Sequence, residues 1–215
     1  MKPGHVLREA GDFADRLSTL LNGTLCQGIR LGAAQLPDGS VRIGRGINKQ
    51  SVSAQTIPVQ RCMGAQLYLV VSYNLDADEF AEHLMVVSSV VGVCLDKHGD
   101  RELFHVDYER GKADGYPEAH LQVVAESADW GTALAHRGHR PLAKMHLPAG
   151  GRRYRTTLED VVHFIIGEKL ADPLPGHGDV LAKYREEFEE RQLRAAIRRN
   201  PEIACEAVDR LRHER

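Results

Sequence analysis

The spacing of hydrophobic residues divides the chain into a helical beginning, a central block of strands and a helical end. Apolar residues recur at helical spacing over residues 5–22, and the Asn-Gly pair at 22–23 is typical of a helix end. The centre shows shorter apolar runs, alternating or continuous, that are separated by turn residues, and this pattern predicts strands. The predicted strands cover residues 25–36, 40–47, 66–75, 85–96, 102–109, 119–125 and 143–148.

Further helices are predicted after the strands. They cover residues 157–170, 178–199 and 202–213. The first of them has Thr157 followed three residues later by Asp160, which is typical of a helix N-terminus. The order of a helix, then strands, then helices predicts an α+β fold with a mainly antiparallel sheet of about five to seven strands. We expect a core domain at residues 1–172 and a C-terminal helical extension at 173–215.

Composition narrows the class of protein. With 42% hydrophobic and 27% charged residues, the chain of 215 residues is typical of a globular protein, and its net charge of −2 gives no general attraction for nucleic acid or membrane. The four cysteines form no C-x-x-C pair, which favours reduced thiols in the cytoplasm. The charged N-terminus is unlike a signal peptide, and the longest apolar run is too short to span a bilayer. We expect a cytoplasmic protein without membrane contact.

Ionisable residues gather in one predicted hairpin, FHVDYERGKADGYPEAHLQV. Side chains alternate along a strand, so His105, Asp107 and Glu109 share one face while the apolar residues between them share the other. On the following strand His120 and Gln122 fall in the matching polar positions. If the two strands pair, the hairpin carries a polar row that contains two histidines and an aspartate.

Three interpretations fit this row. A histidine beside a carboxylate is a general base whose tautomer the carboxylate fixes. Two histidines and one carboxylate also hold a divalent metal with open positions, so the ligands of a metal site here are His105, Asp107 and His120. The third interpretation is a solvent-facing sheet surface, which is common in antiparallel sheets. No other cofactor is indicated.

A basic segment follows the hairpin. Residues 130–158 contain no aspartate or glutamate, and the run PAGGRRYR sets three arginines around Tyr154. Arginine binds phosphate with two parallel hydrogen bonds, and tyrosine stacks on bases. The candidate substrate-binding residues are Arg152, Arg153, Tyr154, Arg155 and Gln122. The alternative is a basic loop that pairs with the acidic C-terminal helix.

The strand LFHVDY, the segment YPEAHLQV and the basic GGRRYR before the helix LEDVVHFII together resemble a pattern in uncharacterised bacterial proteins. Some of those proteins are similar to toxin or defence-module components. The resemblance covers residues 66–170 and implies that a strand with an aspartate, followed by Pro-x-x-His, forms a site. The order of helix, sheet and helices also resembles small ribonuclease toxins at the level of the fold.

We therefore predict a phosphodiester-acting protein, most plausibly an endoribonuclease-like toxin or defence-associated protein that binds RNA. His105 and His120 are the predicted proton-transfer pair, with Asp107 orienting one imidazole, and the arginines hold the phosphate. The alternative is a non-catalytic interaction protein, such as an antitoxin-like or scaffold subunit. In that case the C-terminal helices bind a protein partner or a second copy of the chain.

Overall fold

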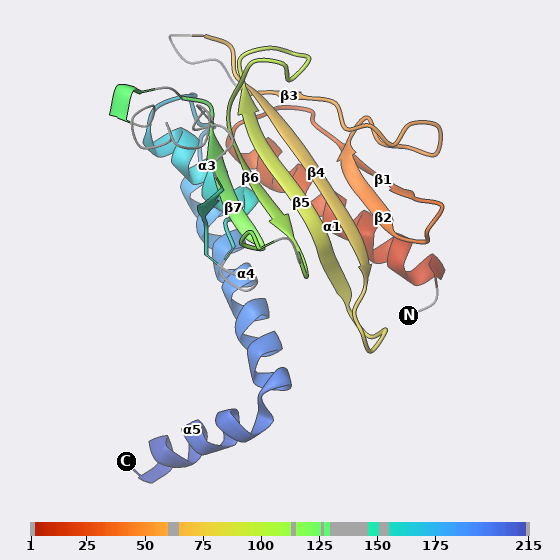
Figure 1. The fold of residues 1–215 in the computed structure, drawn as a ribbon, viewed down its shortest axis with the longest axis vertical. Coiled ribbons are helices and arrows are strands. Elements are labelled where there is room, and N and C mark those ends of the chain that lie inside the picture. Colours follow the sequence, from red (N-terminus) through yellow and green to blue (C-terminus); the bar gives the residue numbers. More distant parts are fainter. Residues whose placement is uncertain are drawn as a thin grey trace.

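The computed structural model of the protein describes residues 3–59, 65–112, 115–125, 127–129, 146–150 and 155–213. The chain begins with helix α1 (Pro3–Thr24), forms one antiparallel sheet, and ends in helices α3 (Leu158–Gly167), α4 (His177–Arg199) and α5 (Pro201–His213) (Figure 1). This order confirms the predicted α+β fold. The strands are β1 (Leu31–Gln35), β2 (Val41–Arg45), β3 (Ile57–Pro58), β4 (Tyr68–Ala77), β5 (Leu84–Cys94), β6 (Glu102–Glu109), β7 (Ala119–Val123) and β8 (Leu147–Pro148).

The sheet is an antiparallel meander. Its strands lie in the order β1-β2-β4-β5-β6-β7-β8, and β3 pairs with β4 beside this path. All of these strands except β3 overlap a predicted strand, and β3 and β8 are only two residues long. Neighbours in space are therefore mostly neighbours in sequence, as short turns between antiparallel strands require.

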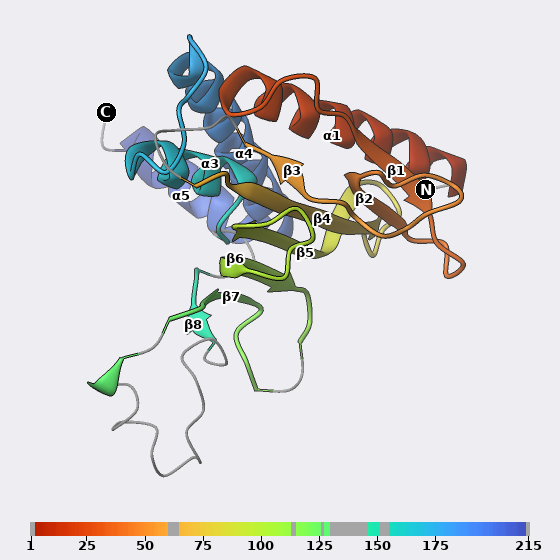
Figure 2. The ribbon, with the colours of Figure 1, turned by 90° about the horizontal axis from the view of Figure 1, so that it is seen from above.

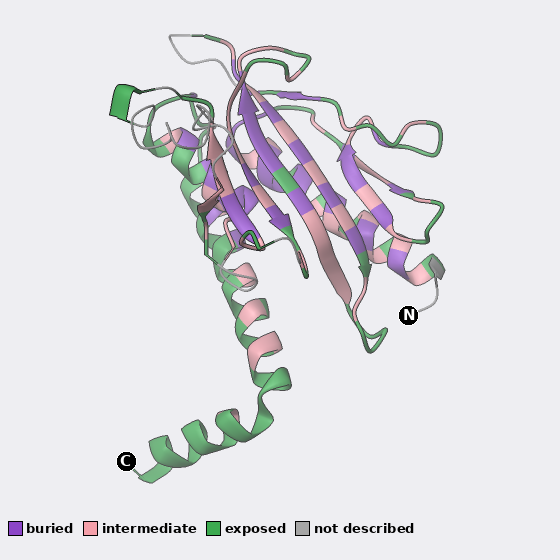
Figure 3. Ribbon diagram, in the orientation of Figure 1, coloured by how far each residue is buried: buried purple, intermediate pink, exposed green. Residues whose placement is uncertain are grey.

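The helices cover one face of the sheet and leave the other face of the central strands open (Figure 2). Burial alternates along β4, where Leu69, Val71, Tyr73 and Leu75 are buried and the residues between them are only partly covered (Figure 3). The buried set packs against α1, whose Leu20 and Leu21 are fully buried. Removing this apolar surface from water is the main stabilisation of the fold.

Helix α3 begins as the sequence predicts. The side chain of Thr157 accepts a hydrogen bond from the backbone N–H of Asp160, and the carboxylate of Asp160 accepts one from the backbone N–H of Thr157 at 2.9 Å. This reciprocal pair is a capping box, and it satisfies donors that a helix N-terminus leaves without partners.

The C-terminal helices change from packed to exposed along their length. At the start of α4, Leu181 and Tyr184 are buried, and Arg16 of α1 bonds to Glu187. No residue from 185 to 213 is buried, and the second half of α4 projects from the body with α5 at its end (Figure 1). The division of domains at residue 172 stays a prediction. Among the described helices, none combines the length and apolarity needed to cross a membrane.

Candidate functional site on the open face of the sheet

Strand pairing brings the predicted polar row together. His105 of β6 lies opposite Gly92 of β5 on one side and Gln122 of β7 on the other, and Asp107 lies opposite His120 of β7. Because paired residues of antiparallel strands point to the same face, the side chains of these residues all lie on the open face. The hairpin pattern therefore places His105, Asp107, His120 and Gln122 side by side.

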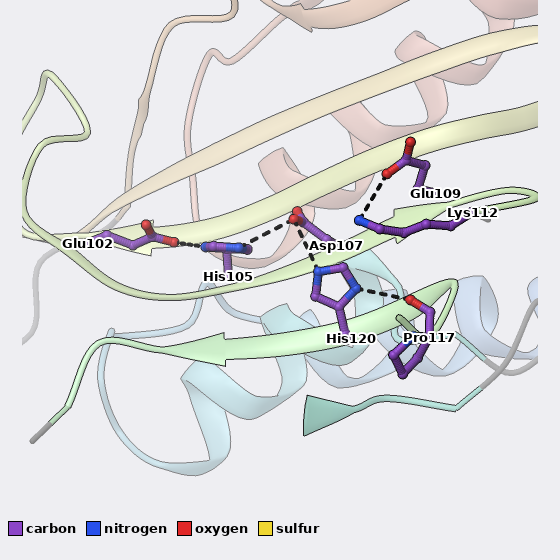
Figure 4. Close-up of polar contacts among 7 residues, drawn as sticks. All are labelled: Glu102, His105, Asp107, Glu109, Lys112, Pro117 and His120. Atoms are coloured by element: carbon purple, nitrogen blue, oxygen red, sulfur yellow. Dashed lines mark hydrogen bonds and ion pairs between the residues drawn. The ribbon is translucent and has the colours of Figure 1, made fainter. Parts of the chain in front are cut away.

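The ionisable side chains form a chain of polar contacts across this face (Figure 4). His105 Nδ1 bonds to Glu102, while His105 Nε2 lies 3.4 Å from Asp107 Oδ2. The same Oδ2 atom lies 3.6 Å from His120 Nε2, and His120 Nδ1 lies 3.2 Å from the carbonyl oxygen of Pro117. One carboxylate oxygen is thus shared by two imidazoles.

The two imidazoles have different surroundings. A carbonyl oxygen only accepts hydrogen bonds, so the contact with Pro117 places a proton on His120 Nδ1. The pKa of His105 is raised from 6.5 to about 9, chiefly by its hydrogen bond to Asp107, against the opposing effect of burial and with further help from Glu102. His105 is therefore an imidazolium at neutral pH.

A cavity of about 330 Å³ lies over His105. Its charged lining consists of Glu102, His105 and Asp107, and aliphatic side chains such as Val70 and Val90 form its walls. Gly92 keeps the cavity open, because a Cβ atom there meets His105 Cβ at 3.4 Å and a larger side chain fills the space. The second oxygen of Asp107, Oδ1, is buried and accepts no hydrogen bond within the described part of the chain.

His120 lies behind Asp107 and not at the surface of the cavity. Its side chain is only 2% exposed, and its ring packs edge-on against His146 with the ring centroids 4.5 Å apart. A substrate in the cavity therefore meets His105 and Asp107, and His120 acts on it only through Asp107.

Two charged residues near the site were missed from the sequence. Glu102 reaches His105 because the register of β5 and β6 shifts between Val93 and Cys94, which places Cys94 opposite Glu102. Such a β-bulge adds one residue to one strand, so strict alternation assigns Glu102 to the wrong face. Lys112 follows the turn after β6, and its ammonium lies 3.2 Å from the carboxylate of Glu109. The spacing of these two residues by three in ERGK is the signal that could have indicated this pair.

The structure does not bring Arg155 to this site. Its guanidinium lies over the ring of Tyr108, with Cζ 4.8 Å from the ring centroid, and Tyr108 is buried on the helix-covered face. Arg155 lines a separate cavity of about 930 Å³ between α1, the sheet and α4. The other three members of the basic run, Arg152, Arg153 and Tyr154, lie outside the described residues.

A metal centre does not follow from this geometry. In the described ranges, no three side chains of the His, Cys, Asp and Glu types are arranged to hold one ion. Both nitrogens of His105 face carboxylates, and a protonated imidazole has no lone pair for a metal. His105, Asp107 and His120 are thus arranged for proton transfer and ion pairing.

Comparison with known proteins gives no match. No protein-family model, no curated protein and no solved structure matches it. The chemistry of the site is therefore the basis for assigning a function.

Proposed function

We propose that this protein cleaves phosphodiester bonds in RNA by acid–base catalysis on the open face of the sheet. One observation carries the proposal: Asp107 Oδ2 lies between His105 Nε2 and His120 Nε2, so that one carboxylate links two imidazoles, and the pKa of one of them, His105, is raised to about 9. Cleavage of RNA by its own 2′-hydroxyl needs one group that takes a proton and one that gives a proton. A base and an acid joined by one carboxylate supply both.

In the proposed reaction the 2′-hydroxyl of RNA attacks the neighbouring phosphorus. Its proton goes to Asp107 and on to Nε2 of His120, the O2′–P bond forms, and the P–O5′ bond breaks. His105 gives its proton to the leaving 5′-oxygen, so the products are a 2′,3′-cyclic phosphate and a 5′-hydroxyl. Transfer of the proton from His120 through Asp107 to His105 then restores the starting state, and no further reactant is consumed.

The cavity supports the placement of a nucleotide. Val70 and Val90 offer an aliphatic wall for a ribose or base, while His105 is the cation among the described residues that line the space. A positive charge fixed beside a phosphate stabilises the charge that develops on it in the transition state. The chain carries a net charge of −2, so contacts to the phosphate must be local ones.

The experiment uses the purified protein and a labelled single-stranded RNA, with product ends identified by mass spectrometry. His105→Gln is expected to slow cleavage by about 100-fold or more, since it removes the acid. His98→Gln, in the exposed turn after β5, is the matched control and is expected to cleave at the wild-type rate. Equal cleavage rates for His105→Gln and the wild type would show that His105 takes no part in the reaction.

The biological setting follows from this proposal. We propose that the protein acts in the cytoplasm, and its expression in bacterial cells is expected to arrest growth as a toxin or defence-associated nuclease does. Expression of His105→Gln beside the wild type tests this expectation. Equal growth arrest by the two proteins would mean that any toxicity does not depend on His105.

A second candidate function is favoured by the exposed C-terminal helix. Helix α5 has no buried residue, and three of its large apolar side chains are exposed: Ile203, Val208 and Leu211. A non-catalytic interaction protein, such as an antitoxin-like or scaffold subunit, would bind its partner through such an exposed apolar surface. Catalysis and partner binding involve different parts of the molecule and are tested separately.

A further inference from the structure

Helix α5 is amphipathic and stands apart from the body of the protein. Successive residues of a helix are rotated by about 100°, so the apolar residues of α5 share one side. They form a seam made of Ile203, Ala204, Ala207, Val208 and Leu211. The seam is exposed, with Ile203 67% and Leu211 62% accessible. A helix of 13 residues is marginal in water by itself, so this seam needs a partner.

The body of the same chain cannot cover the seam by folding α5 back along α4. Helix α4 ends at Arg199 and α5 begins at Pro201, so Asn200 is the single residue between them. Two antiparallel helices of one chain need a connection of about two to five residues. No described residue of the same chain buries the seam, which leaves it accessible to another chain.

The charges of α5 indicate which chain supplies the partner helix. Glu202 and Glu206 lie in its N-terminal half, whereas Arg210, Arg212 and His213 lie in its C-terminal half together with Asp209. A helix with opposite charges in its two halves is complementary to an antiparallel copy of itself. Twofold symmetry is also the commonest symmetry of protein assemblies.

We propose that α5 pairs antiparallel with α5 of a second copy and thereby joins two chains in a symmetric dimer. With Ala207 at the twofold axis, Ile203 of each copy packs beside Leu211 of the other. The small side chain of Ala207 lets the two helices approach closely at the centre. This inference is independent of the RNA-cleaving function, and it names the partner for the exposed seam.

The same register pairs charges along one edge of the seam. Arg210 of one copy lies beside Glu206 of the other, and this pair occurs twice because of the symmetry. Pairs at such positions contribute little individually, but reversing the sign of one partner replaces every attraction with a repulsion.

The test measures the mass of the full chain in solution by analytical ultracentrifugation at micromolar concentrations. The wild type is expected to sediment at twice the chain mass of 23.9 kDa. Variant B (Glu202→Arg with Glu206→Arg) leaves Asp209 as the one acidic residue of the helix, and variant A (Arg210→Glu with Arg212→Glu) removes both of its arginines. Each variant by itself is expected to dissociate, with affinity lowered at least about tenfold.

An equal mixture of A and B distinguishes lost pairing from lost folding. In the mixed pair the side chains at positions 206 and 210 again have opposite charges across the seam, so the mixture is expected to recover the dimer that neither variant forms by itself. Glu186→Arg with Glu189→Arg, at exposed positions near the middle of α4, makes the same change of charge as variant B and is expected to remain dimeric.

Three results would overturn the proposal. They are a wild type that stays at the mass of one chain, a dimer that persists in variant A or B, and a mixture of the two that stays dissociated. The RNA cleavage assay is read separately, so failure of the dimer and failure of the catalytic proposal are distinguishable.

Discussion

The raised pKa of His105 predicts a specific pH dependence of stability. A histidine with a pKa of 6.5 in the unfolded chain and about 9 in the folded protein binds its proton more tightly after folding. Its contribution to stability is therefore complete below pH 6.5, declines as the pH rises, and is lost above about 9. The full difference corresponds to about 3 kcal/mol. Because the ring is only half-buried and solvent screens its ion pairs, we expect about 1 to 2 kcal/mol.

The measurement compares the wild type with His105→Gln, which keeps a polar side chain without the charge. Urea unfolding at several pH values between 6 and 10 gives the free energy of unfolding of each protein, and other titrating groups largely cancel in the difference. The stability advantage of the wild type is expected to be largest at pH 6 and to fall by about 1 to 2 kcal/mol by pH 10. A difference that stays constant with pH, or grows at high pH, would refute a stabilised imidazolium at this position.

Three further predictions concern single residues. Asp107→Asn removes the largest cause of the raised pKa of His105, so we expect an NMR titration of the variant to give a His105 pKa well below 9. An unchanged pKa would contradict the contact between His105 and Asp107. Gly92→Val fills the cavity with a residue that suits a strand; we expect RNA cleavage to be lost with thermal stability kept, and full activity argues against the cavity as the substrate site. Thr157→Ala removes the N-cap of α3, and we expect it to lower the free energy of unfolding, measured with urea, by about 1 kcal/mol. Thr156→Ala, one residue earlier, is the control.

Periodicity alone was enough to predict most of the fold. Burial on one face produces the alternation of β4 and β6, and the meander follows because short turns join antiparallel neighbours. The same alternation placed His105 and Asp107 on one face, and strand pairing put His120 opposite Asp107. These relations are local in sequence, so a single chain is sufficient to infer them.

The parts that could not be predicted depend on irregular or distant geometry. Glu102 reaches His105 through a shift of register that no residue pattern marks. Arg155 is close in sequence to other arginines, yet its guanidinium lies over Tyr108 and Phe188 on the covered face. Alternation does not determine the course of a loop that passes the sheet edge. The burial of His120 likewise depends on its packing against His146, which is distant in sequence.

The most direct test of the central claim is the rate at which Asp107→Asn cleaves RNA, compared with the wild type at neutral pH. Among the described residues, Asp107 is the one group that contacts both His105 and His120, so its loss separates the proposed base from the proposed acid. We predict that the wild type produces 2′,3′-cyclic phosphate ends and that the variant does so at least about 100-fold more slowly. Equal rates for the two proteins, or no cleavage of RNA by the wild type, would contradict the account.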